Sequence, residues 1–174
     1  MAALDAAAAA VNPVPSPMEN AMRHRFLLAL AGYLLSITSG CAQLNESPWA
    51  EVKGKRYAVD LADTPELRER GLMFRRELAP DAGMLFIHDD AEPLAYWMKN
   101  TYIPLDILYF DQNRRLVSAQ LGVLPCGQQP QCPIYPSAGP AKYVLELNAG
   151  QAADLGLKRG DELRFGGFDG EDRP

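Results

Sequence analysis

The sequence predicts a small α+β domain, mainly β, that is built on a barrel or a strongly bent sheet and carries two short helices. Three observations lead to this prediction. Six or seven short segments with strand character occur within about 115 residues, with turn residues between them. Only two short segments carry helix signals. Long helices that alternate with strands are missing, which argues against a doubly wound nucleotide-binding sheet.

The first strand and the first helix lie close together in the sequence. Residues Arg56–Leu61 alternate polar and apolar side chains, a pattern that predicts a strand. Thr64-Pro65-Glu66 opens a helix, because Thr can cap it, Pro suits its first position and Glu favours its positive end. We expect this helix to end near Met73-Phe74.

The middle of the chain is predicted to be β-structure throughout. Gly83–His88 is one apolar strand and Leu94–Met98 is a second. Asp106–Phe110 and Arg114–Leu121 lie on either side of the turn Asp111-Gln112-Asn113, which predicts a hairpin.

The last elements are shorter. Lys142–Leu147 is another alternating strand, and Ala149–Leu155 is predicted to form a short helix that Gly156 stops. Gly160-Asp161 then turns into a final strand at Glu162–Phe165.

Composition and charge narrow the classes of function. The chain has 174 residues, 48% of them apolar, and a formal charge of −5. Without its first forty residues it keeps 134 residues and the same charge, which suits one domain with its own core. A mildly acidic domain lacks the basic face that nucleic acids require. Runs of Lys and Arg that bind an anionic membrane are missing too, so we expect membrane attachment through the N-terminus only.

The N-terminal segment reads as an export signal. Residues 1–21 contain an Ala run and several prolines, and we expect a disordered extension ahead of a translation start at Met22, with Met18 as the alternative. Met22-Arg23-His24-Arg25 is a basic start, and Phe26–Ile37 is an apolar run of 12 residues. Because a bilayer span needs about 20 residues, this run predicts a signal peptide instead.

The signal peptide ends in a sequence that is similar to a bacterial lipobox. Thr38-Ser39-Gly40 precedes Cys41, which would become the diacylated first residue, although Thr38 departs from the usual Leu. The alternative is cleavage at a nearby small residue, which would leave a soluble periplasmic protein. Because Ala42 is not Asp, the resemblance to lipoprotein sorting implies the outer membrane. We therefore expect a lipoprotein on the periplasmic side of the cell envelope.

The cysteine count agrees with export. The chain has three cysteines, so lipidation of Cys41 leaves Cys126 and Cys132 as a pair in a loop rich in Pro and Gly. In an oxidising compartment a disulfide is the default, and closure of this short loop stabilises by about 2 kcal/mol. The alternative, a metal or redox site, is disfavoured because the spacing is not Cys-x-x-Cys and no second Cys or His pair completes a zinc site.

These observations divide the chain into five parts. They are a disordered extension (1–21), a signal peptide (22–41), a polar tether (42–54), the β-rich domain (55–165) and a flexible tail (166–174).

A series of local motifs carries a family resemblance. They are Arg70-Gly71-Leu72-Met73-Phe74-Arg75, Gly83-Met84-Leu85-Phe86, Trp97-Met98-Lys99-Asn100-Thr101, Ile103-Pro104-Leu105-Asp106-Ile107 and Tyr143-Val144-Leu145-Glu146-Leu147-Asn148-Ala149-Gly150. In this order they closely resemble the family DUF192, over about residues 55–165. The resemblance implies a compact β-rich fold and frequent export, but it implies no reaction.

Trp97-Met98-Lys99-Asn100-Thr101 is the strongest candidate for ligand contact. On a strand, Trp97 and Lys99 point to one face and Met98 and Asn100 to the other. An aromatic surface beside an ammonium and an amide group is suited to ligand binding. The structural alternative is that Trp97 and Met98 belong to the core, and that Asn100-Thr101 caps a turn before Pro104.

Three charged residues complete the candidate site. Asp106 precedes an apolar strand, where it can orient Lys99, accept a ligand hydroxyl or bind turn amides. Glu146 lies inside a strand and shares the face of Val144. If that face is buried, we expect an internal ion pair between Glu146 and either Arg70 or Lys99.

The sequence does not support several common kinds of catalytic site. His88 is the only histidine after the signal peptide, and we expect it at the surface, outside any Ser-His-Asp triad. Counting excludes a zinc site with several histidines, and no phosphate-binding Gly-rich loop is found, so we expect neither metal nor cofactor. Acid/base chemistry by Asp63, Asp106 and Glu146 remains open if two of these carboxylates lie about 5–10 Å apart.

The residues therefore favour binding over catalysis. We expect a monomeric, lipid-anchored envelope protein that binds a small molecule, a glycan or a partner protein through the Trp97–Asp106 region. Two alternatives stay open: a carboxylate-dependent hydrolase that acts on envelope carbohydrate, and a structural or assembly factor with an exposed apolar patch.

Overall fold

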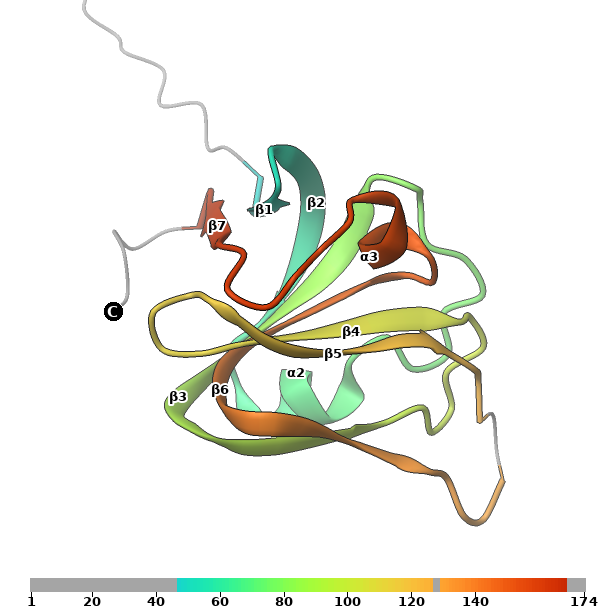
Figure 1. Ribbon diagram of the computed structural model, residues 1–174. Coiled ribbons are helices and arrows are strands. Elements are labelled where there is room, and N and C mark those ends of the chain that lie inside the picture. The colour runs from blue at the N-terminus through green and yellow to red at the C-terminus, as the bar shows by residue number, and fades with distance from the viewer. Residues whose placement is uncertain (1–46, 127–128, 169–174) are drawn as a thin grey trace, which may run out of the picture. The chain divides into compact units, whose positions relative to one another are not determined.

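The structure is a computed structural model of the chain, and it describes residues 47–126 and 129–168. The extension, the signal peptide and the lipobox-like Cys41 lie outside the described residues. The described part forms a single seven-stranded sheet that is curled into a half-barrel, with two short helices (Figure 1). This agrees with the mainly β, α+β class that the sequence predicts.

The strands are arranged in the order β5-β4-β6-β3-β2-β1-β7. All neighbouring strands are antiparallel except β2 and β3, which are parallel and are connected through α2. The elements are β1 (Trp49–Val52), β2 (Lys55–Ala62), α2 (Pro65–Arg70), β3 (Ala82–Trp97), β4 (Leu105–Phe110), β5 (Leu116–Val123), β6 (Ile134–Asn148), α3 (Gln151–Asp154) and β7 (Leu163–Gly166).

The two ends of the sheet meet at one point. The bridge between Arg115 and Glu162 joins the start of β5 to the start of β7. Two backbone hydrogen bonds support it: the Leu116 N–H donates to the Asp161 carbonyl and the Leu163 N–H to the Arg114 carbonyl, both over 2.9 Å. Barrel-like closure protects strand edges from pairing with other chains.

The sequence predicts a polar tether at residues 42–54, and this prediction is wrong for the second half of the segment. Trp49–Val52 forms β1, which pairs with β2 and β7, and Ala50 and Val52 are buried. Lys53-Gly54 has positive φ at both residues, as a two-residue hairpin turn requires. The strand was missed because it is only four residues long and Pro48 and Gly54 suggested a loop.

The two central strands are longer than the sequence predicts. Gly83–His88 and Leu94–Met98 are not separate strands: except for Met98, both belong to the single strand β3, which bends at the irregular pairing between Ile87 and Glu92. Its partner β6 starts at Ile134, well before the predicted Lys142, and contains Pro136 and Pro140. Figure 1 shows β3 and β6 bending side by side.

The first helix is shorter than predicted. The Leu67 N–H donates to Thr64 Oγ1 over 3.3 Å, so Thr64 caps the helix as expected. The helix ends at Arg70 instead of Met73-Phe74, because Gly71 takes a positive φ of 46° that terminates it. The second helix covers only Gln151–Asp154 of the predicted Ala149–Leu155.

The sheet separates two hydrophobic clusters, since successive side chains of a strand point to opposite faces. The first cluster includes Leu145 and Leu147 of β6 and is covered by β1, β7 and α3. The second cluster includes Val144 of β6 and extends to Leu72 and Met98. Gly166 ends β7, and Phe168 stacks on Phe165, so the predicted flexible tail does not begin before Asp169.

Candidate functional site

Five of the seven predicted ligand-binding residues line one narrow pocket. The cavity holds about 30 Å³, which is enough for one or two water-sized groups. It lies where the end of α2 faces β3 and β6. The five residues are Arg70, Trp97, Lys99, Thr101 and Glu146.

Glu146 lies on the second-cluster face of β6. Its side chain is only 4% exposed, yet it lines the pocket. Burial raises the pKa of its carboxyl group from 4.5 to about 8, so the group is protonated at neutral pH. A protonated carboxyl group can donate one hydrogen bond and accept others.

The internal ion pair that we expected for Glu146 is not formed. Within residues 47–126 and 129–168, no hydrogen bond or ion pair joins its carboxyl group to Arg70, Lys99 or any other side chain. The prediction was wrong because it assumed that a buried carboxyl group must be charged. Burial neutralises the group instead, and a neutral acid needs no cation.

Three aromatic side chains enclose Glu146 from the sheet side. The Tyr96 ring packs edge-on against Phe86 at 5.1 Å and against Tyr109 at 5.9 Å, measured between ring centroids. Burial first, and then the nearby Glu146 carboxyl group, raise the pKa of the Tyr96 and Tyr109 hydroxyls. Both hydroxyls therefore stay protonated at neutral pH, and that of Tyr109 donates to the Tyr135 carbonyl over 2.6 Å.

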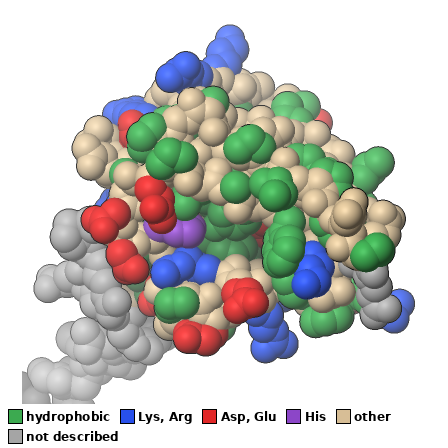
Figure 2. All heavy atoms as spheres, turned by 90° about the horizontal axis from the view of Figure 1, so that it is seen from below, with side chains coloured by type: hydrophobic (Ala, Val, Ile, Leu, Met, Phe, Trp, Pro, Cys, Tyr) green, Lys and Arg blue, Asp and Glu red, His purple; other side chains and the backbone are tan. Residues whose placement is uncertain are grey.

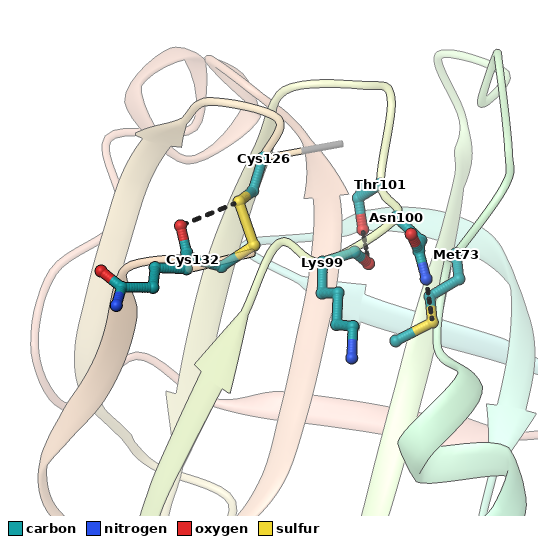
Figure 3. The surroundings of a disulfide bond; sticks show 7 residues. Met73, Lys99, Asn100, Thr101, Cys126 and Cys132 are labelled. Carbon is teal, nitrogen blue, oxygen red and sulfur yellow. Dashed lines mark hydrogen bonds between the residues drawn. A yellow bond between two sulfur atoms is a disulfide. The ribbon is translucent and has the colours of Figure 1, made fainter. Parts of the chain in front are cut away.

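Trp97 and Lys99 form the outer edge of the pocket. Trp97 is 45% exposed, and the Lys99 ammonium lies 4.8 Å from the centroid of its ring. The two side chains share a face while Met98 is buried between them, as the strand pattern predicts. Trp97 is therefore not a core residue. Lys99 runs between the disulfide on one side and Met73 with Asn100 on the other (Figure 3).

Asn100 and Thr101 form the turn that the structural alternative predicts. The Thr101 N–H donates to the Met98 carbonyl over 3.2 Å, and Asn100 has a φ of 56°. The Asn100 carbonyl accepts the N–H of Phe74 over 2.7 Å, and its Nδ2 lies 3.8 Å from Met73 Sδ. Phe74 also has a positive φ, of 65°. Two residues in an uncommon conformation thus hold the turn after α2 against the end of β3.

Two open grooves adjoin the pocket and share Arg70 and Met73 with it. The first groove, of about 340 Å³, is large enough for a sugar-sized ring. The second, of about 480 Å³, lies between α2 and β2. The face of the molecule seen in Figure 2 is hollowed, and hydrophobic side chains lie there beside Lys or Arg side chains. The first groove is lined by Glu66, Glu69, Arg70, Met73, Trp97, Lys99 and Asn100.

Asp106 does not belong to this site. It is fully buried on β4, where its carboxylate accepts the N–H of Gly122 over 2.8 Å and the N–H of Ala152 over 2.9 Å. Ile107, not Asp106, pairs with Glu146, so Asp106 and Glu146 point to opposite faces of the sheet. The predicted acid/base pair of Asp106 and Glu146 is therefore wrong, and Asp106 has a structural role.

The comparison with family models tests the family membership that the sequence motifs suggested. The model of the family DUF192, described as "Uncharacterized ACR", matches residues 49–165. The chain belongs to the DUF192 family. Its matched segment begins at β1 and ends in β7, so the DUF192 domain is the curled sheet with both helices.

Two solved structures are similar to this DUF192 domain. A protein of unknown function from Novosphingobium aromaticivorans DSM 12444 is 35% identical, with a TM-score of 0.60 and coverage of 67% of this chain and 82% of that one. A protein from Sinorhizobium meliloti 1021, described as a candidate transcription regulator, is 36% identical, with a TM-score of 0.61 and coverage of 73% and 100%. No curated protein matches the sequence.

The predicted disulfide is present in the DUF192 domain. Cys126 and Cys132 are joined by a bond of 2.04 Å and close a loop beside the site. The Cys126 N–H donates to the Met98 carbonyl over 3.3 Å, so the loop is attached directly to the segment that carries Trp97 and Lys99. The disulfide thereby restricts the outer edge of the pocket.

His88 is more buried than the sequence predicted. Its Nε2 lies 3.0 Å from the Tyr96 hydroxyl, and burial, with a smaller effect of Arg68, lowers the pKa of the imidazole to about 4. His88 is therefore neutral at physiological pH. It supports Tyr96, which lines the pocket, and does not face solvent as a free surface residue.

Sequence reasoning missed the pocket wall of the DUF192 domain. Gly71, Met73, Phe86 and Tyr96 line the pocket, although none was a candidate. The one signal was the glycine itself, since Gly71 takes a positive φ of 46° that glycine adopts readily.

The described part of the domain contains no candidate for a metal site or for a membrane-spanning helix. No group of three or more His, Cys, Asp or Glu side chains is placed to hold a metal ion there. Of the helices described, none has both the length and the apolar character of a membrane span.

Proposed function

We propose that this protein is a binding module of the cell envelope that recognises a small hydroxylated ligand of sugar size. The observation that carries the proposal is the Glu146 carboxyl group. It is buried without an ion-pair partner among the described residues, and it lines a narrow pocket beside the exposed Trp97 ring. A buried polar group that opens only to a pocket is suited to contact a ligand.

The shape of the site supports a ring with hydroxyl substituents. The groove beside Trp97, of about 340 Å³, accepts a sugar ring, and the exposed indole offers a flat apolar surface against its C–H groups. The inner pocket of about 30 Å³ accepts only one small substituent. A sugar ring that lies on Trp97 and directs one hydroxyl toward Glu146 fits the volumes of both the groove and the inner pocket.

The protonation state of Glu146 supports a hydroxyl as that substituent. A protonated carboxyl group both donates and accepts hydrogen bonds, and so does a hydroxyl group. The Thr101 hydroxyl lines the same pocket. Binding is favoured over hydrolysis because Asp106, the expected second carboxylate, lies on the opposite face of the sheet.

Export to the envelope and lipid attachment are part of this proposal. The basic start at Met22, the apolar run and the lipobox-like end at Cys41 support them, although these residues lie outside the described part. The disulfide of the domain gives independent support, because disulfides persist in oxidising compartments.

Ligand binding is tested on the purified full-length protein with a panel of monosaccharides, followed by calorimetric or NMR titration. Trp97→Ala is expected to weaken binding about 30-fold, which corresponds to the loss of about 2 kcal/mol at a central aromatic contact. Trp97→Phe should retain part of the affinity. Because Trp97 is half-exposed, its removal should leave the melting temperature nearly unchanged.

The control is Leu124→Ala, which truncates a more exposed apolar side chain that lines none of the three cavities. This variant should bind like the wild type. A panel with no binding sugar, or a Trp97→Ala variant that unfolds, would contradict the proposed role of Trp97.

The location is tested by cell fractionation and by labelling with a radioactive fatty acid. The wild-type protein is expected in the membrane fraction with label on Cys41, and Cys41→Ser should lose both the label and the membrane attachment. A protein that stays in the cytosol, with free thiols at Cys126 and Cys132, would rule out export.

A further inference from the structure

Two basic side chains at the pocket have no acidic partner. Arg70 and Lys99 both line the narrow pocket and the adjoining groove. Within residues 47–126 and 129–168, neither side chain forms an ion pair, and the Lys99 ammonium lies 4.8 Å from the centroid of the Trp97 ring. Elsewhere in the domain basic side chains do find carboxylates, for example Arg68 with Asp89 at 3.6 Å.

The charges of the inner pocket are unbalanced. Arg68, Arg70 and Lys99 line it, together with the carboxylate of Glu69 and the protonated carboxyl group of Glu146. Since Arg68 is paired with Asp89, Arg70 and Lys99 are the two basic residues of the lining without an ion pair among the described residues, and Glu69 is the one charged acidic residue of the lining. Arg68 is already occupied, because its Nη1 donates to the backbone carbonyls of Asp63 and Ile87. Arg70 and Lys99 remain for a ligand.

From this arrangement we infer that the ligand is an acidic sugar, a hexuronate whose ring lies on Trp97 and whose carboxylate lies between the Arg70 guanidinium and the Lys99 ammonium. The inference rests on the proposed function and names the chemical class of its ligand. The neutral Glu146 does not repel such a carboxylate. Guanidinium and ammonium groups bind carboxylates through charge-assisted hydrogen bonds. Glu66 and Glu69 line the same groove and repel a ligand carboxylate placed beside them.

The test compares galacturonate with galactose. The two sugars differ at one position, where galacturonate carries a carboxylate and galactose a hydroxymethyl group. Titration of the full-length protein at pH 7 is expected to give at least tenfold tighter binding of galacturonate, and added salt should reduce this preference. Arg70→Gln and Lys99→Gln should each weaken galacturonate binding about five- to tenfold and reduce the preference for galacturonate over galactose. A galacturonate oligomer, titrated alongside, distinguishes a polymer-bound source from the free sugar.

Arg159→Gln and Lys158→Gln are the matched controls, because both side chains are exposed and line none of the three cavities. They should bind galacturonate like the wild type. Equal affinity for the two sugars, lost in Trp97→Ala, would overturn the inference and leave the proposed function standing. Absence of binding by both sugars would overturn the inference, and the proposed function would fall with it only if no other sugar of the monosaccharide panel bound.

Discussion

Glu146→Gln is expected to stabilise the fold by about 5 kcal/mol at pH 9 and to leave its stability nearly unchanged at pH 4. The reason is the pKa of the carboxyl group, which burial raises from 4.5 to about 8 in the folded state. Below pH 4.5 the group is protonated in both states. Between pH 4.5 and 8 the unfolded chain releases the proton and the folded chain keeps it, so stability falls as pH rises. At about 1.4 kcal/mol per pKa unit, the shift lowers the free energy of unfolding by about 5 kcal/mol, and this loss is complete above pH 8.

Urea denaturation of the wild type and the variant at pH 4, 6, 7.5 and 9 measures this difference. His88 acts in the opposite direction, because its pKa is lowered to about 4 and stability therefore rises with pH between 4 and 6.5. Since both proteins contain His88, its effect cancels in their difference. Glu92→Gln, a change at an exposed residue of β3, is the control and should alter stability little at any pH. A stability difference between the wild type and Glu146→Gln that stays constant between pH 5 and 8 would contradict the raised pKa of Glu146.

The local sequence predicted the elements that depend on a few neighbouring residues. The cap at Thr64, the hairpin of β4 and β5 and the alternating part of β6 were all confirmed. Hydrogen bonds between near neighbours determine the cap and the hairpin, and the alternation of side chains in β6 is visible in the local sequence although its partner strands are distant. The disulfide was predicted for the same reason, because its six-residue separation leaves the two cysteines close.

The bend that joins two predicted strands into β3 could not be predicted in this way. Asp89-Asp90 and Pro93 lie between the two predicted strands, and the pairing is irregular there. The strand continues because β6 follows it through the bend. Local composition cannot reveal a partner strand that is about fifty residues away in the sequence.

Five of the seven predicted ligand-binding residues line the pocket, but the chemistry of the site was not predicted. The strand pattern placed Trp97 and Lys99 on one face, and the structure confirms this arrangement. It also placed Glu146 on a buried face, which is confirmed. It did not predict that the buried carboxyl group would be neutral and would lack a cationic partner among the described residues. The protonation state of a buried group depends on its whole surroundings, which only the folded structure provides.

Asp106→Ala is expected to destabilise the fold by about 3–5 kcal/mol without changing ligand affinity in the folded protein. The Asp106 carboxylate accepts the N–H of Gly122 at the irregular pairing of β5 and the N–H of Ala152 in α3. The side chain is 0% exposed, so water cannot replace it without a local opening. Each buried N–H that loses its acceptor costs about 1–3 kcal/mol, and a charged acceptor raises the cost.

Hydrogen exchange at Gly122 and Ala152, together with urea denaturation, checks this prediction. Both amides should exchange faster in Asp106→Ala than in the wild type. Asp106→Asn is the graded variant and should lose less stability, because one amide oxygen can still accept while the NH₂ group faces the second N–H donor. Affinity must be unaffected, since Asp106 points to the face of the sheet opposite Glu146. A variant that folds normally but binds its ligand more weakly would place Asp106 in the binding site, and would contradict the division of the two carboxyl groups between structure and recognition.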